Sequence, residues 1–279
     1  MIKIIAVFDG LKFSEATLHH SIKMSKSQGA HLVGLFLEDF TYQSFSRYRA
    51  IAKDKMTEKE ITALEQKDAE QRKASRQKFE EVCQREGIEF TMHKEADVAY
   101  PALIHESIYA DLVIIDQAET FTPYQEEKPT QFIKDFLSAT ECPVLLVRTA
   151  EDINAATLLF DGSPNSVFAI KQFSYVVKSA ADKPVEVITV KSGDESLHLP
   201  DNKLMKEFMK RHFPNANFNV LKGDVADVEI IEKLRSENNN SLIVLGAYKR
   251  GFVSRWFKES LADSLMRNVS NPLFIAHAK

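Results

Sequence analysis

The chain has 279 residues, of which 44% are hydrophobic and 27% charged, the balance of a folded globular protein rather than a disordered one. Its formal net charge of −4 excludes an overall basic field that would draw the chain to nucleic acid or to an anionic membrane. No apolar run reaches the length of a membrane span and the sequence opens on a strand pattern, so we expect a cytoplasmic protein of one large or two ordinary domains.

The first elements in the chain form a βαβ pattern. Residues 2–8 are a near-continuous apolar run, as in a strand buried on both faces, and they end at Asp9-Gly10. Ser14 predicts the start of a helix that Gly29 closes, and the apolar residues 31–37 predict a second buried strand. This order of elements is typical of doubly wound α/β sheets.

Residues 39–78 form a charged insertion in this pattern. Thr57 and Glu60 have the spacing of a capping box, which predicts a helix that runs to Glu86, before Gly87. The first half of this helix contains few apolar residues. The charge pattern favours a solvated extension of the helix, and an arm that contacts a protein partner is the functional alternative.

Three further strands and two helices complete a first domain at residues 1–148. The strands are expected at 88–93, 112–115 and 144–147, and the helices around 101–108 and 132–137. The loop at 117–128 contains no glycine and three glutamates. It therefore lacks the residues that allow a backbone to approach a phosphate closely, and we expect no nucleotide in this half.

The second half repeats the first. Phe160-Asp161-Gly162 follows Phe8-Asp9-Gly10 by 152 residues, and Asn271-Pro272 follows Cys142-Pro143 by 129 residues. The insertion in the first half explains why the two spacings differ. This duplication predicts a second domain at residues 156–279. Its strands are expected at 157–160, 185–190, 218–221, 242–245 and 273–276, and its helices around 167–180, 204–212, 228–234 and 254–268.

No motif for catalysis or metal binding stands out. The eight histidines are scattered and fit no paired-ligand spacing. The two cysteines, Cys83 and Cys142, match no metal or redox motif, and we interpret them as reduced, unreactive thiols. We therefore expect no catalytic residue, no metal and no enzyme activity.

Three features of the second half point together to one family. Asp161 ends the first strand, Gly223 follows the third, and Gly246 opens a basic loop after the fourth. With them, the chain resembles the universal stress protein family in a tandem arrangement. The resemblance implies an α/β fold of two tandem five-stranded parallel α/β sandwich domains, each doubly wound with strand order 3-2-1-4-5. It also implies that the domains pair through their last strands as a pseudo-twofold internal dimer, in a monomer or a homodimer.

Some members of this family bind ATP through a loop of spaced glycines followed by serine or threonine. Aligned with that motif, this chain has Gly246 and Ser260 but carries Lys249 and Glu259 in place of two glycines. Side chains at these positions hinder the close backbone approach that phosphate needs, and Glu259 adds a repelling carboxylate. The resemblance therefore implies a degenerate phosphate site, unless Gly251 shifts the loop into a different register.

The resemblance assigns further candidate contacts, each with a structural alternative. Asp161 matches a residue that contacts base or ribose, but an aspartate after a strand also caps the next turn. Ser260 and Asp263 have the spacing of a capping box. Packing explains Val190 equally well, and Gly223 fits an ordinary turn. The candidate ligand residues are Asp161, Val190, Gly223, Gly246, Gly251 and Ser260.

Two functions follow from this pattern. The first is a non-enzymatic stress-response protein with degenerate or absent ATP binding, which acts through protein interaction or signalling. The second is a switch that binds ATP or AMP, or a slow ATPase, that uses only the C-terminal pocket. ATP in the C-terminal domain is the one cofactor that the sequence leaves open, and neither nucleic acid nor a membrane is an expected partner.

Overall fold

The computed structural model describes residues 2–39, 56–122, 124–192, 198–237, 240–248 and 260–278. In the first half the strands are β1 (Lys3–Asp9), β2 (His31–Asp39), β3 (Phe90–Asp97), β4 (Leu112–Asp116) and β5 (Val144–Val147), and the helices are α1 (Glu15–Gln28), α3 (Glu58–Arg85), α4 (Ala99–Ser107) and α5 (Gln131–Ala139). In the second half the strands are β6 (Ala155–Leu159), β7 (Val185–Lys191), β8 (Asn217–Lys222), β9 (Ser241–Leu245) and β10 (Leu273–Ile275). Its helices are α6 (Pro164–Val176), the 3₁₀ helix η1 (Lys178–Asp182), α7 (Asn202–His212), α8 (Ala226–Glu237) and α9 (Leu261–Asn268).

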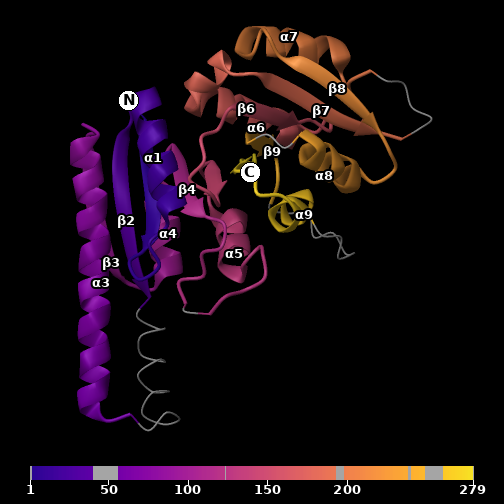
Figure 1. Ribbon diagram of the computed structural model, residues 1–279. Coiled ribbons are helices and arrows are strands. Elements are labelled where there is room, and N and C mark those ends of the chain that lie inside the picture. Colours follow the sequence, from indigo (N-terminus) through magenta and orange to yellow (C-terminus); the bar gives the residue numbers. More distant parts are fainter. Residues whose placement is uncertain are drawn as a thin grey trace.

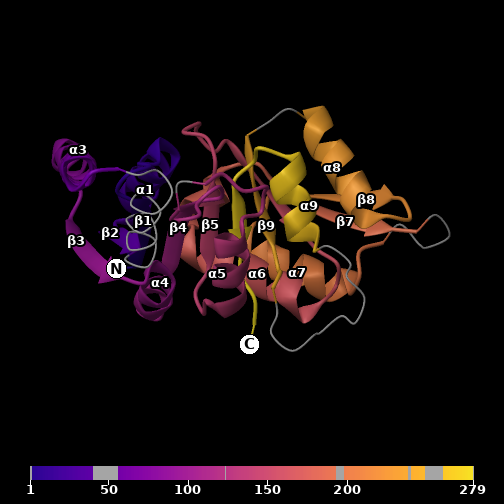
Figure 2. The same ribbon diagram turned by 90° about the horizontal axis from the view of Figure 1, so that it is seen from below.

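The described strands form a single ten-stranded sheet in the order β3-β2-β1-β4-β5-β10-β9-β6-β7-β8 (Figure 1). Each half therefore has the predicted order 3-2-1-4-5, with parallel neighbours throughout. β5 and β10 pair antiparallel and join the halves, which confirms the predicted pairing of last strands. The two halves lie side by side, with β5 and β9 near the centre (Figure 2).

Helices cover both faces of the sheet, and each face has its own apolar core. Buried side chains of α1, α3, α6 and α7 form one core, and those of α4, α5, α8 and α9 form the other. Each core contains residues of both halves and so extends across the β5–β10 pair that joins them. The strands β1, β4, β5 and β9 are consequently buried on both faces, as their apolar runs predict.

Local signals set most helix ends as expected. Ser14 caps α1 by accepting a hydrogen bond from the backbone N–H of Thr17, and Gly29 ends the helix in the left-handed region at φ 58°. Thr57 and Glu60 form the complete capping box predicted for α3. These side chains satisfy backbone groups that the helices leave unpaired at their ends.

Three predicted elements have other boundaries in the structure or lie partly outside the described residues. The helix expected at 167–180 starts at Pro164 and ends at Val176, where η1 takes over. The third strand, expected to end at residue 93, continues to 97 because β3 pairs with β2 in register along its whole length. Within the last expected helix, α9 begins at residue 261, and 254–259 lie outside the described part of the chain.

The predicted insertion contains both a packed and an exposed stretch of α3, while residues 40–55 lie outside the described residues. Between Ile61 and Ser75 no residue of α3 is buried, which agrees with a solvated extension. From Ser75 onward the helix packs on the sheet, because the Ser75 hydroxyl donates to the Gly10 carbonyl at 2.7 Å and Phe79 is fully buried. The last residues of the range 39–78 therefore belong to the crossover helix of the first half.

Candidate functional site

A pocket of about 470 Å³ lies at the carboxyl ends of β6, β7 and β9, in the second half. This end of a parallel sheet, where the chain crosses to either face, is where α/β proteins usually bind ligands. Asp161, Val190 and Gly246 all line it, so three of the six predicted residues come together here. We call it the strand-end pocket. Gly223 and Ser260 are not among its lining residues, and Gly251 lies outside the described residues.

Asp161 caps the turn that leads into α6. Its Oδ1 accepts a hydrogen bond from the backbone N–H of Ser163 at 2.9 Å, which is the structural alternative that the sequence offered. Burial raises the pKa of Asp161, but hydrogen bonds from Ser163 and Ser166 outweigh it and hold the pKa below its ordinary value. The pocket therefore contains an ionised carboxylate, which can accept hydrogen bonds from hydroxyl or amino groups.

Gly246 is required by packing. A Cβ atom at this position would lie 2.5 Å from the carbonyl oxygen of Asn165, near the start of α6. This contact is with the backbone, so neither side can yield by a side-chain rotation. We expect Gly246→Ala to destabilise the ligand-free protein by roughly 1–3 kcal/mol, as overpacking does.

Urea denaturation without nucleotide measures this effect. Gly87→Ala serves as the comparison, because a Cβ there meets nothing within 4 Å and only the positive φ of 65° opposes it. If Gly246→Ala has native stability and loses only nucleotide binding, the glycine serves phosphate rather than packing.

The start of α9 is capped by the chain itself. Ser260 Oγ accepts from the backbone N–H of Asp263 at 3.2 Å and donates to the Asp263 carboxylate at 2.9 Å. The Tyr248 hydroxyl also donates to Asp263, and burial together with that carboxylate raises the pKa of Tyr248. Sequence reasoning identified the Ser260 cap but missed Tyr248. A phosphate at this helix start would meet the carboxylate of Asp263.

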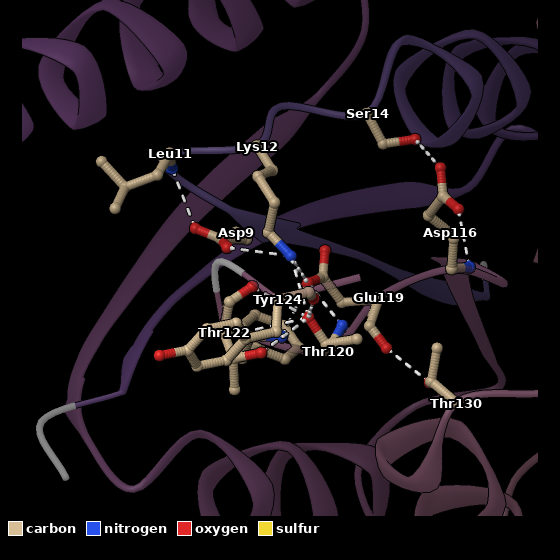
Figure 3. Close-up of polar contacts among 12 residues, drawn as sticks. Asp9, Leu11, Lys12, Ser14, Asp116, Glu119, Thr120, Thr122, Tyr124 and Thr130 are labelled. Carbon is tan, nitrogen blue, oxygen red and sulfur yellow. Dashed lines mark hydrogen bonds and ion pairs between the residues drawn. The ribbon is translucent and has the colours of Figure 1, made fainter. Parts of the chain in front are cut away.

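The corresponding edge of the first half contains a pocket of about 720 Å³ that Lys12 and Glu119 line. Beside it lies a polar cluster (Figure 3), which we call the Glu119 cluster and which consists of Asp9, Lys12, Glu119 and Thr120. Lys12 Nζ lies 3.2 Å from Glu119 Oε1, 3.0 Å from Thr120 Oγ1 and 3.7 Å from Asp9 Oδ2. Glu119 is 5% exposed. A lysine from the loop after β1 is thus joined to the loop after β4.

The same Glu119 oxygen is held by backbone amides. It accepts hydrogen bonds from the N–H groups of Thr120 at 2.9 Å and Phe121 at 2.8 Å. Phe121 has φ 51°, in the left-handed region that is unfavourable for a bulky residue. Consecutive N–H groups with a nearby lysine are typical of anion sites, and here the anion is a carboxylate of the chain. The sequence indicated an acidic loop without glycine but gave no signal that Glu119 turns inward.

Three further side chains fix this loop. Asp116 accepts a hydrogen bond from the backbone N–H of Ala118 at 2.9 Å, so it caps the turn after β4. Ser14 Oγ donates to the other Asp116 oxygen at 2.8 Å, and Thr130 Oγ1 donates to the carbonyl of Glu119 at 2.6 Å. The Glu119 cluster is therefore tied to the starts of both α1 and α5.

Both cysteines are free, and burial suppresses their reactivity. Burial raises the pKa of Cys83 to about 12 and that of Cys142 to about 11. We expect neither thiol to react measurably with a disulfide reagent at pH 8 in the native state, and both to react after unfolding in urea. Absorbance during the titration counts the modified thiols. Rapid native labelling of either residue would contradict the burial argument.

Among the described residues, no group of three or more histidine, cysteine or acidic side chains is placed to hold a metal ion. Within the same residues, no helix combines the length and the apolar character needed to cross a bilayer.

Solved structures show what this fold is similar to, whereas no protein-family model and no curated protein match the sequence. A universal stress protein from Archaeoglobus fulgidus aligns over 99% of this chain and 98% of its own, with TM-score 0.66 and 16% identity. A protein described as a putative universal stress protein from Pseudomonas aeruginosa aligns over 99% of this chain and 93% of its own, with TM-score 0.62 and 14% identity. These identities are too low to carry more than the fold.

The same fold also occurs in other settings. The cytoplasmic domain of a prokaryotic cation chloride cotransporter aligns over 99% of this chain and 95% of its own, with TM-score 0.52 and 10% identity. A shared fold does not by itself assign a function. The alignments do show that this chain has the tandem universal stress protein fold. The 3-2-1-4-5 strand order of each half and the pairing of β5 with β10 agree with this fold.

Proposed function

We propose that this chain is a non-enzymatic stress-response protein of the universal stress type, which acts through contacts with other proteins. Its first half binds no nucleotide. The observation that carries this proposal is the Glu119 cluster, in which a carboxylate of the chain takes up two loop amides and Lys12. A phosphate at the same place would have to displace a buried acceptor.

The start of α9 in the second half also argues against nucleotide binding. Asp263 sits at the start of α9, bonded to Ser260 and Tyr248, where the helix N-terminus would otherwise favour an anion. The Asp263 carboxylate already accepts the hydrogen bonds of the Ser260 and Tyr248 hydroxyls, and it repels a second negative charge. A triphosphate would therefore gain little from this helix start.

Isothermal titration with ATP and AMP, together with an assay of phosphate release from ATP, tests this proposal. We expect no heat of binding and a release rate equal to that of buffer. Binding that persists in Asp161→Ala but is lost in Lys12→Met would place a nucleotide in the first half, against the proposal.

The exposed half of α3 is the surface that we assign to protein contacts. Leu64 on this stretch is 47% exposed and the residues around it are charged and solvated. If a partner binds here, Leu64→Glu abolishes its capture, whereas Leu204→Glu retains it, because Leu204 is 66% exposed on α7 in the other half. Equal capture by both variants would remove α3 from the proposal.

The strand-end pocket favours a second candidate, a switch that binds an adenine nucleotide. Its volume of about 470 Å³, its apolar walls and the ionised Asp161 suit a base and ribose, with the phosphates toward solvent. Thermal denaturation with ATP, AMP and inorganic phosphate distinguishes the two candidates, since a ligand that binds only the native state raises the melting temperature. A rise that Asp161→Ala removes and Asp182→Ala keeps would favour the switch.

A further inference from the structure

Another cavity lies between the two halves, at the opposite end of the strands from the strand-end pocket. It has a volume of about 240 Å³ and sits at the amino ends of β6 and β9, whereas the strand-end pocket sits at their carboxyl ends. We call it the inter-repeat cavity. Its walls come from α1 of the first half, from α6 and η1 of the second half, and from the linker at 152–154.

The walls of the inter-repeat cavity are mainly apolar. The buried apolar contributors are Met24, Ala156, Phe173, Val177, Ala180 and Leu242, and the half-buried ones are Ile153 and Ala155. An apolar cavity of about 150 Å³ is enough to bind benzene in a protein interior. A cavity of 240 Å³ therefore has room for a molecule of one or two rings.

One cation at this cavity lacks a counter-ion. Lys183 lines it and donates a hydrogen bond to the backbone carbonyl of Ile153, and no described carboxylate forms an ion pair with it. The one acidic residue in the lining, Asp152, is already paired with Lys23 and His19, at 3.1 and 2.9 Å. The ammonium group of Lys183 is thus the charge that a ligand can complement.

The histidine in the lining, His20, adds no charge to the cavity. His20 Nε2 lies 2.9 Å from the carbonyl oxygen of Thr149, so this nitrogen carries the proton and donates it. Burial lowers the pKa of His20, which keeps the ring neutral at neutral pH. The ring therefore adds apolar surface and a fixed tautomer, and the positive charge of the site rests on Lys183.

We propose that the inter-repeat cavity binds a small aromatic carboxylate of one or two rings. The ring lies against Met24, Ile153 and Val177, and the carboxylate pairs with Lys183. Such a ligand touches α1, η1 and the linker at once, so it holds the two halves together. This site is separate from the strand-end pocket and does not depend on nucleotide binding.

Titration of the full chain with benzoate and 2-naphthoate tests the proposal, with acetate and benzamide as probes that lack the ring or the charge. We expect the aromatic acids to bind and to raise the melting temperature, and acetate and benzamide to bind at least tenfold more weakly. No binding of either aromatic acid, or equal binding of benzamide, overturns the proposed ligand class.

Two pairs of variants locate the site. Lys183→Met keeps the alkyl stem and is expected to weaken binding at least tenfold. Lys178→Met, at the other end of η1 and outside the lining, is expected to leave binding unchanged. Ala180→Leu fills the cavity and is expected to abolish binding, whereas the neighbouring, exposed Ala181→Leu does not. Equal affinities within either pair contradict the assignment.

A readout on the unmodified chain guards against variants that fail to fold. With ¹³C-labelled methionine methyl groups, the aromatic acids are expected to shift the Met24 resonance, because Met24 lines the cavity. Met92, at the exposed edge strand β3, should not move. Binding that leaves the Met24 resonance in place would put the acid at another site.

Discussion

Glu119→Ala is expected to lower the free energy of unfolding by about 2–4 kcal/mol, because the variant leaves buried hydrogen-bond donors without an acceptor. The backbone N–H groups of Thr120 and Phe121 both point at the Glu119 carboxylate, and Lys12 loses a partner at the same time. Water has little access to replace the lost carboxylate as a hydrogen-bond acceptor, since Glu119 is 5% exposed. Urea denaturation followed by circular dichroism measures the loss.

Glu119→Gln separates the hydrogen bonds from the charge. The amide oxygen of glutamine can accept the same bonds without the cost of burying a negative charge, so we expect a loss below about 1 kcal/mol. Glu127→Ala, an exposed change in the same loop, controls for loop flexibility and should be neutral. Equal losses for the alanine and glutamine variants would mean that the charge, rather than the acceptor, stabilises the loop.

The same group gives a pH dependence with a defined sign. Burial is the main reason why the pKa of Glu119 is raised, the charge of Asp9 raises it further, and Lys12 and the two loop amides oppose the rise. The folded state then binds this proton more tightly than the unfolded state. Stability from Glu119 therefore increases as the pH falls from the raised pKa toward the ordinary value for glutamate, and it is lost as the pH rises through the raised pKa.

Glu119→Gln should remove this part of the pH profile and leave the rest of it unchanged. The comparison requires unfolding free energies of the wild type and of the variant at several pH values between about 4 and 8. Parallel profiles for the two proteins would show that the environment of Glu119 does not favour its protonated form.

Phe79→Ala is expected to have the largest effect on stability, about 3–5 kcal/mol, because a fully buried aromatic ring is deleted. The ring centroid of Phe79 lies 5.6 Å from that of Phe8 and 5.8 Å from those of Phe36 and Phe90. Phe79 thereby fixes α3 to the sheet. Leu64→Ala, on the exposed stretch of the same helix, should be nearly neutral in the same denaturation experiment.

Gly34 on β2 is the other half of this contact. A Cβ atom there would lie 2.7 Å from two ring carbons of Phe79, so Gly34→Ala alone is expected to cost roughly 1–3 kcal/mol. Combining it with Phe79→Leu, a smaller side chain, should give a loss below the sum of the two single losses. Additive losses would show that α3 does not press on Gly34.

The Glu119 cluster and the contact between Phe79 and Gly34 determine different properties of the first half. The Glu119 cluster takes up two loop amides and Lys12 at the edge of the sheet, beside a pocket of about 720 Å³. Phe79 and Gly34 place the second half of α3 on the sheet, whereas the stretch between Ile61 and Arg72 contains no buried residue. The first half has therefore kept the fold, while a carboxylate of the chain occupies hydrogen-bond donors at its strand ends and its crossover helix is extended.

The sequence by itself determined the architecture. Apolar runs bounded by Asp9-Gly10 and Asp161-Gly162, together with the repeated proline before each last strand, were enough to predict two copies of one domain. Such signals are local: burial on both faces requires a continuous apolar run, and capping requires a particular side chain at a particular position. The order 3-2-1-4-5 itself came from the family resemblance.

Only the tertiary structure decided how the candidate sites are occupied. Lys12 and Glu119 are 107 residues apart, and no local pattern indicates that they meet at a loop amide pair. Gly246 matched a phosphate motif, but its close neighbour is the backbone of Asn165, which only the packing of α6 on β9 brings there. Residues that fill a site come from distant elements, so their positions follow from the pairing of the strands and not from the sequence around each of them.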